Sequence, residues 1–299
     1  MLEQPQLKDG NVDKVNWLSS TPFFAMHLAF LLPIWVGASW VAVLTCVFLY
    51  YARMFGITGG YHRYFSHASY KTSRAFQFFL AWLGCSSMQK GPLWWASLHR
   101  HHHAHSDQEE DIHSPLTHGF WWSHVGWIVC NRYNETKWSL VQNFTRYPEL
   151  VWMNKYHSVP GFVLAGVVFL FGWFLEAFYP GLGTDRWQML VWGWLISTVV
   201  LYHGTFTINS LAHVFGSRRY PTKDGSRNNF WLALITMGEG WHNNHHYLPS
   251  SARMGFRWYE IDLSLYVLTM LSWVGLVWDL KKPPQHIANP SAEPLARAS

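Results

Sequence analysis

The stretch Trp95-Ala96-Ser97-Leu98-His99-Arg100-His101-His102-His103 decides how the rest of this chain is interpreted, because so apolar a chain rarely gathers imidazoles unless they hold metal. In an α-helix that turns about 100° per residue, His99, His102 and His103 lie within about 100° of arc and face one way. His101 then points to the opposite side. The stretch therefore predicts three metal ligands on one helical face.

Two further clusters extend the pattern. His242-Asn243-Asn244-His245-His246 repeats the spacing and again places three imidazoles on one face. His62 and His67 are five residues apart, a turn of about 140° on an α-helix, so they can share a metal cluster only from different sides or where the helix ends. Eight clustered histidines exceed what one ion can use, and two metals in an all-histidine shell is the economical interpretation.

A ninth ligand is available in Asn209-Ser210-Leu211-Ala212-His213. His213 lies where an apolar stretch ends, and Asn209, one helical turn earlier, could hold a metal-bound water. Nitrogen ligands suit iron, copper, zinc or nickel, and spacing alone does not choose among them. The three cysteines form no CxxC pair, which argues against an iron–sulfur site or a disulfide framework.

Composition places these histidines in or against a membrane. The chain is 49% hydrophobic and only 13% charged, whereas soluble domains carry about 25% charged residues. Four apolar stretches, at about residues 22–38, 39–59, 160–179 and 187–208, each come near the roughly 20 residues that a span needs. The alternative, buried helices of a soluble domain, is disfavoured because the first two stretches have no polar face. We predict an all-α integral membrane protein with four transmembrane helices.

The basic residues indicate the orientation of these helices. Of 22 lysine and arginine residues, only Arg53 and Arg186 fall in the spans or in the loops on the opposite side. Both termini and the histidine clusters are therefore predicted to be cytoplasmic. We expect one domain over residues 1–282, with a helical cytoplasmic domain formed by 60–159 and 209–282, an interfacial helix within 263–280, and a disordered tail at 283–299.

Residues around the clusters have predicted supporting roles. Imidazole ligands generally donate their second N–H to a carboxylate or carbonyl. The acidic residues placed to accept are Asp107, Glu109, Asp111 and Glu239. His124 is predicted to support the second cluster without binding metal, whereas unclustered histidines such as His27 and His203 are predicted to be ordinary satisfied polar residues.

The motifs His62-x4-His67, His99-x2-His102-His103, Asn209-x3-His213 and His242-x2-His245-His246, with the flank Gly238-Glu239-Gly240-Trp241, resemble those of the membrane-bound fatty acyl desaturases, specifically the stearoyl-CoA Δ9 type. The resemblance covers roughly residues 20–282. It implies that the nine histidines bind two iron ions, with Asn209 contributing through water. It also implies a cis double bond introduced into a saturated C16–C18 chain with dioxygen and two electrons.

The resemblance extends to the substrate tunnel, for which it implies the residues Tyr50, Met54, Gln89, Trp95 and Thr205. Bulk at Met54 favours C16 over C18 chains. The chain departs from its acyl-CoA relatives at Ser97-Leu98, where they carry an Arg-Asp pair near the CoA headgroup. This change leaves CoA, a phospholipid or acyl carrier protein open as the acyl carrier, with acyl-CoA only slightly preferred.

Electrons must come from a partner, because the chain has neither GxGxxG nor a haem motif. A cytochrome b5-like or ferredoxin-type carrier with its reductase is expected, together with membrane lipid and no nucleic acid. The basic stretch Arg218, Arg219, Lys223 and Arg227 is either its docking site or an ordinary solvated surface. Two alternatives stay open: a hydroxylase with the same histidines, and a metal transporter, which predicts more polar residues inside the spans than Arg53.

Overall fold

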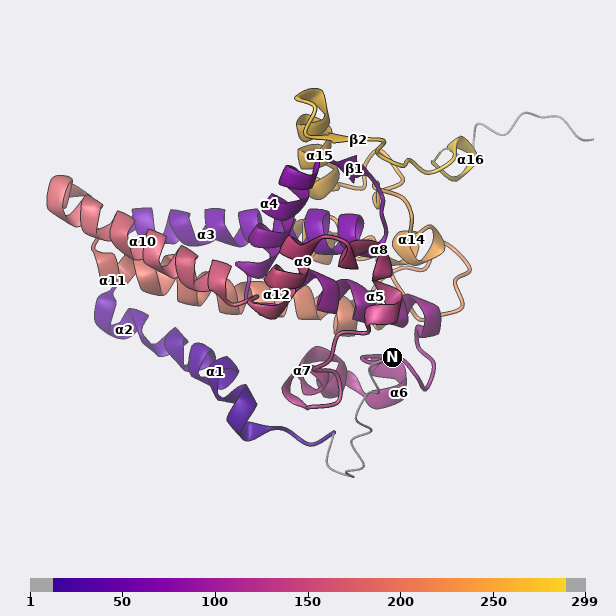
Figure 1. Cartoon of the computed structure of the whole chain (residues 1–299), viewed down its shortest axis with the longest axis horizontal. Helices are drawn as coiled ribbons and strands as arrows, with labels where there is room; N and C mark the ends of the chain where they lie inside the picture. The colour runs from indigo at the N-terminus through magenta and orange to yellow at the C-terminus, as the bar shows by residue number, and fades with distance from the viewer. Residues whose placement is uncertain (1–12, 289–299) are drawn as a thin grey trace, which may run out of the picture.

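The computed structural model describes residues 13–288 (Figure 1). Long helices run side by side as α3, α10 and α12, while α1 and α2 run obliquely beneath them and the shorter helices and loops gather at one end. The helices long and apolar enough to cross a membrane are Trp17–Val36, Trp40–Ser66, Val159–Phe178 and Arg186–His213. The four-helix, all-α class predicted from the sequence is confirmed.

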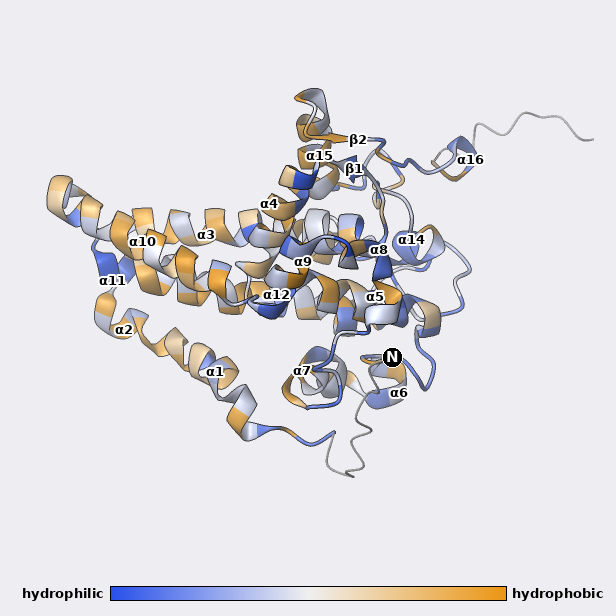
Figure 2. Ribbon diagram, viewed as in Figure 1, coloured by the Kyte–Doolittle hydropathy of each residue, from blue (hydrophilic) through white to orange (hydrophobic). Residues whose placement is uncertain are grey.

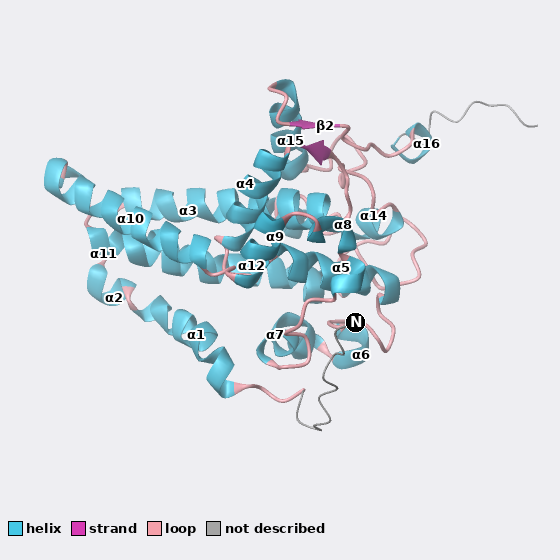
Figure 3. Cartoon of the chain, in the orientation of Figure 1, coloured by secondary structure: helices cyan, strands magenta, loops and turns pink. Residues whose placement is uncertain are grey.

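The first part of the chain contains helices α1 (Trp17–Leu28), α2 (Pro33–Val36), α3 (Trp40–Phe55), α4 (Arg74–Cys85), α5 (Pro92–His105), α6 (Pro115–His118), α7 (Trp127–Val129), α8 (Gln142–Thr145) and α9 (Pro148–Lys155). The second part contains α10 (Val159–Phe178), α11 (Arg186–Gln188), α12 (Ser197–Ser210), α13 (Phe230–Ile235), α14 (His242–Tyr247), α15 (Leu263–Trp273) and α16 (Gln285–Ala288). Two short strands, β1 (Lys71–Thr72) and β2 (Val277–Trp278), pair antiparallel (Figure 3).

Local capping sets where the first helices begin. The Asn16 side chain accepts from the amide of Ser19 at 3.1 Å, so α1 begins at Trp17, earlier than the predicted residue 22. Gly37 then takes a left-handed φ of 69°, which ends α2. Ser39 caps α3 by accepting from the amide of Ala42 at 3.2 Å. The hairpin between the first two spans therefore falls at the predicted place.

The second helix does not end at residue 59 as predicted, because α3 continues as a π-helix over Gly56–Ser66. In this geometry hydrogen bonds join residues five apart, and the amide of His67 donates to the carbonyl of His62 at 3.2 Å. The two imidazoles consequently lie on one side of the helix end and pack edge to face, with ring centroids 4.9 Å apart. The angle of about 140° expected for an α-helix does not apply here.

Hydropathy divides the molecule along its long axis. Figure 2 shows hydrophobic residues along α1, α3 and α10 and hydrophilic residues towards α8 and α14. On α10, large apolar side chains such as Phe162 and Leu170 are exposed, at 59% and 61%. An apolar surface of this kind needs lipid around it, so the chain is a membrane protein.

The C-terminal region differs in part from expectation. Helix α15 has 11 residues, about half of what a span needs. Helix α16 lies inside the stretch 283–299 that was predicted to be disordered, so that prediction is wrong for residues 285–288. The rest of that stretch, 289–299, lies outside the described residues.

Close contact between the π-helix Gly56–Ser66 and α4 gives a first prediction. A Cβ added at Gly56 would lie 2.8 Å from the backbone atoms of Leu83 and Gly84, which cannot rotate away. We expect Gly56→Ala to lower the free energy of unfolding by about 1–3 kcal/mol, because it forces two helices apart. Gly166→Ala is the matched control, since nothing lies within 4 Å of its added Cβ. Thermal unfolding of both variants in detergent checks this; equal midpoints would contradict it.

Candidate metal centre

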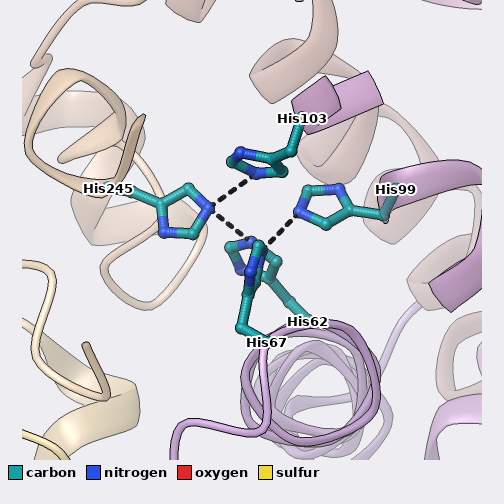
Figure 4. A group of neighbouring side chains, drawn as sticks. All are labelled: His62, His67, His99, His103 and His245. Atoms are coloured by element: carbon teal, nitrogen blue, oxygen red, sulfur yellow. Dashed lines mark hydrogen bonds between the residues drawn. The ribbon is translucent and has the colours of Figure 1, made fainter. Parts of the chain in front are cut away.

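Two groups of imidazoles form the centre of the polar end. In the first group the ring nitrogens lie within 4.8 Å of one another, and its members are His62, His67, His99, His103 and His245. Figure 4 shows these five rings converging from separate segments. The second group meets the same limit and consists of His102, His213, His242 and His246. All nine histidines predicted as ligands thus lie in one of the two groups.

The two HxxHH motifs contribute to these groups in opposite ways. On α5, His99 and His103 are one turn apart and enter the first group, while His102 enters the second. On α14, His242 and His246 are one turn apart and enter the second group, while His245 enters the first. Side chains four residues apart share a helical face, whereas adjacent ones cannot aim at one point. The prediction that each motif presents all three histidines to one side is therefore wrong: each motif gives a one-turn pair to one group and a single histidine to the other.

Carboxylates hold the outer nitrogens of four rings. The Nδ1 atoms of His102 and His213 lie 2.9 Å from Asp111 and Asp107, respectively. Glu239 contacts Nδ1 of His62. These three acceptors were predicted from the sequence. The fourth, Asp224, lies 2.7 Å from Nδ1 of His246 and was missed, since it follows a basic stretch and nothing in its spacing marks it.

These contacts leave the inner nitrogens available to bind a metal. A ring that donates from Nδ1 to a carboxylate keeps its lone pair on Nε2. The inner Nε2 of His62 lies 3.0 Å from Nε2 of His245, and that of His213 lies 3.0 Å from Nε2 of His242. The buried Nε2 of His246 has no hydrogen-bond partner among residues 13–288. Converging lone pairs of this kind fit a cation between them, so the residues present suit a metal.

Burial and mutual repulsion lower the pKa of several of the rings, whereas at His102 burial is outweighed by Asp111, which raises the pKa. Burial first, and neighbouring imidazoles second, hold the pKa values of His67, His99, His103 and His245 well below the usual range. The same effects lower the pKa of His246 to about 4, although Asp224 opposes them. Burial would raise the pKa of Asp107, but His213 and Ser114 outweigh it and lower the value to about 2. At neutral pH these five rings with lowered pKa values are therefore neutral, and Asp107 is an ionised acceptor.

Two cavities meet beside the histidine groups. The larger, of about 280 Å³, is bounded by α1, α5, α7 and α12 and reaches His99. The smaller, of about 40 Å³, runs along α3 and is lined by His62, His102 and His242. Residues that line both are Trp95, His99, Thr205 and Asn209. The two cavities therefore adjoin each other beside the histidines.

Most of the predicted tunnel residues line these cavities. Gln89 lines the larger cavity and donates to Thr205 Oγ1 at 3.0 Å, and Trp95 stacks on His99 with ring centroids 4.9 Å apart. Met54 lines the smaller cavity. Tyr50 lines neither described cavity, because its hydroxyl donates to the carbonyl of Ile235 at 2.7 Å.

Two predicted supporting residues lie elsewhere. Glu109 is exposed, and among residues 13–288 it makes no hydrogen bond to a histidine. His124 hydrogen-bonds Ser210 at 2.9 Å and His203 at 3.0 Å, so its ring packs against α12 instead of supporting the second histidine cluster. Both roles were predicted because the residues follow the His99–His103 motif in the chain. The segments after α5 direct the two side chains away from the metal-site histidines.

Only some of the predicted docking residues are exposed and without an acidic partner in the described part of the chain. Arg218 and Lys223 are exposed. Arg219 pairs with Glu260, and Arg227 donates to the carbonyl of Gly216 at 3.3 Å. The exposed basic charge of this stretch is therefore smaller than the sequence suggested.

Comparison with known proteins gives consistent matches. The family model described as fatty acid desaturase matches residues 38–264. The chain is 36% identical to an sn-1 stearoyl-lipid 9-desaturase of Anabaena variabilis over 274 residues, 90% of this chain and 94% of that protein. It is 38% identical to Delta-9 acyl-lipid desaturase 1 of Arabidopsis thaliana over 247 residues, 83% and 77% of the two chains. It is 34% identical to an acyl-CoA C20 Delta5-desaturase of Anemone leveillei over 256 residues, 83% and 76%.

The role of Asp224 gives a second prediction. Asp224→Ala removes the acceptor of His246, and loss of such a partner weakens metal binding about 10–100-fold. We expect this variant to lose metal at lower chelator concentrations than the unmodified protein. Glu109→Ala removes an exposed carboxylate of the same region and should keep its metal. Metal per chain after dialysis against graded chelator measures both; equal retention would contradict the assignment.

Proposed function

Because the chain belongs to the fatty acid desaturase family, we propose that it introduces a cis double bond at the Δ9 position of a saturated C16–C18 acyl chain, using dioxygen and two electrons from a separate carrier. It is an oxidoreductase of a family that acts on fatty acyl substrates in membranes. The observation that carries the proposal is the junction of the two cavities beside both histidine groups.

The proposed cofactor is a pair of iron ions, one in each histidine group. The first group offers five imidazoles and the second four, with Asn209 lining the cavity beside the second. Imidazole ligands suit iron among other metals, and the family resemblance favours iron. Bound there, the two ions would activate dioxygen and supply the oxidant that no side chain can provide.

The protein positions one carbon pair. In the overall reaction two adjacent methylene groups lose two hydrogen atoms, dioxygen takes them up with two electrons and two protons, and two waters leave. Trp95, stacked on His99, and Thr205, which accepts a hydrogen bond from Gln89, lie at the junction between the cavities. A chain threaded through it presents the same carbons to the histidines in every turnover, which is the basis of regioselectivity.

The Δ9 position rests on similarity and on the cavity. Two of the relatives are named as desaturases at position 9, whereas the Anemone protein is named as a Delta5-desaturase. The larger cavity, of about 280 Å³, precedes the junction and has room for the carboxyl half of the chain. A hydroxylase with the same histidines is the second candidate, and its product would carry a hydroxyl group instead of a double bond.

The proposed membrane orientation places the histidines where an electron-donor protein could reach them. The basic residues favour both termini and the histidines on the cytoplasmic side. A cytochrome b5-like or ferredoxin-type carrier would dock there, and exposed Arg218 and Lys223 offer it positive charge. Arg219 contributes less, because Glu260 neutralises it.

The function is tested by product analysis. Purified protein with iron, dioxygen and a competent electron donor should convert labelled palmitoyl substrate to a C16 product with a cis bond at carbon 9. His245→Ala should abolish conversion and lower bound iron, since it removes a ligand of the first group. His101→Ala should retain both, because its ring lies by the carbonyl of Glu110, at 2.9 Å. Gas chromatography–mass spectrometry locates the bond; a hydroxylated product would overturn the proposal.

Chain-length selection gives a further prediction. Met54 is buried at 1% exposure and lines the smaller cavity, where the methyl half of the chain would lie. Met54→Ala lengthens this space, so we expect the C18-to-C16 product ratio to rise about tenfold, the scale of discrimination by one or two methylenes. Met153→Ala truncates an equally buried methionine outside both cavities and should leave the ratio unchanged. Competition between palmitoyl and stearoyl substrates measures the ratio; equal ratios would show that Met54 does not limit length.

A further inference from the structure

A strained turn between α4 and α5 forms part of the wall of the larger cavity. Met88, Gln89 and Lys90 all line it. Met88 and Lys90 have left-handed φ angles of 60° and 62°, which cost about 1–3 kcal/mol each outside glycine and persist only where the surroundings enforce them. The Tyr202 hydroxyl donates to the carbonyl of Met88 at 3.1 Å, and the Tyr61 hydroxyl to that of Lys90 at 2.9 Å.

Buried Arg53 fixes the same turn from inside the membrane helices. It is 1% exposed and donates to the carbonyl of Ser86 at 3.2 Å and to Thr198 at 2.6 Å. An arginine in a span is costly unless it has such partners. The turn is therefore held in place before any substrate binds, and Lys90 lies on the cavity wall at a fixed position.

Lys90 is a half-buried cation without an anion. Its Nζ donates to Asn134 Oδ1 at 2.6 Å and lies 4.6 Å from the ring centroid of Trp94. No carboxylate within residues 13–288 lies within 4.0 Å of it. Burial lowers its pKa to about 8, and burial with the nearby Lys90 charge lowers the pKa of His157. A charge withdrawn from water in this way favours an anionic ligand.

The cavity itself indicates which anion. Among its lining residues Lys90 is the only lysine or arginine in the described part of the chain, and His157 lines the same cavity. The rest of that wall is largely apolar, with Leu98, Ile112 and Trp127. One molecule that fills the cavity therefore needs an apolar chain that reaches His99 and an anionic group at Lys90.

We propose that Lys90, assisted by His157, binds the phosphate of the acyl carrier and thereby sets which carriers deliver an acyl chain. The inference rests on the proposed function and names its substrate class: acyl groups on a phosphate-bearing carrier. Lysine is a common phosphate ligand. CoA and phospholipids share this chemistry, whereas a galactolipid offers no phosphate.

Binding without turnover tests the proposal. Purified full-length, iron-loaded protein without an electron donor is titrated with three labelled probes of equal chain length: palmitoyl-CoA, palmitoyl-lysophosphatidylglycerol and monopalmitoyl-galactosylglycerol. We expect Lys90→Met to raise the Kd of the phosphate-bearing probe about tenfold, the scale for losing a hydrogen bond to a charged group. The Kd for the galactosyl probe should change less than about twofold. Lys90→Arg should restore most of the affinity, and His157→Gln should give a smaller loss.

Matched variants and probes separate the outcomes. Lys137→Met is the control, because Lys137 is also half-buried with a burial-lowered pKa but lines neither described cavity. Lys90 dependence confined to palmitoyl-CoA identifies CoA as the carrier, and dependence confined to the lysolipid identifies a phospholipid. Equal weakening for all three probes, or no weakening, overturns the proposal.

The inference and the proposed function can fail separately. The absence of unsaturated product from every probe, with a competent electron donor, would refute the proposed function. The role of Lys90 depends only on the measured Kd values.

Discussion

Convergence of nine imidazoles on a buried centre is the constraint on which the rest of the structure depends. Inner Nε2 atoms lie about 3 Å apart in each of the two groups, an arrangement that suits a cation bound between them. The outer nitrogens of four rings are held by Asp107, Asp111, Asp224 and Glu239. Those carboxylates are in turn positioned by further contacts, such as the pairing of Arg63 with both Glu239 and Asp262. The polar end of the molecule is thus organised outward from the ligands.

Two segments with irregular backbone geometry shape this centre and the cavity beside it. The π-helix over Gly56–Ser66 brings two rings five residues apart onto one side, which an ordinary α-helix cannot do. It is also where the second span passes from an apolar environment into the histidine groups. The left-handed residues Met88 and Lys90 likewise occur where the chain turns to face the cavity. Departures from regular geometry thus lie where the binding surfaces require them.

The sequence was sufficient for the helical class, the number of spans and the histidine clusters, because apolar length and ligand spacing are direct signals. It failed where a side chain's direction depends on a turn. Asp224 lies 22 residues before His246 and no periodicity connects them, whereas Glu109 looked well placed and points to solvent. Tyr50 is on the expected helix, but its hydrogen bond to Ile235 takes it out of the cavity wall. The partner of a long-range contact cannot be read from local pattern.

The reciprocal use of α5 and α14 has a thermodynamic consequence. Each helix gives a one-turn pair to one group and a single ligand to the other, so an ion bound in either group would hold both helices in place. A second ion would then bind to helices that are already ordered. If each group binds an ion, occupancy of the two groups is linked, and by reciprocity each ion would raise the affinity for the other by the same factor.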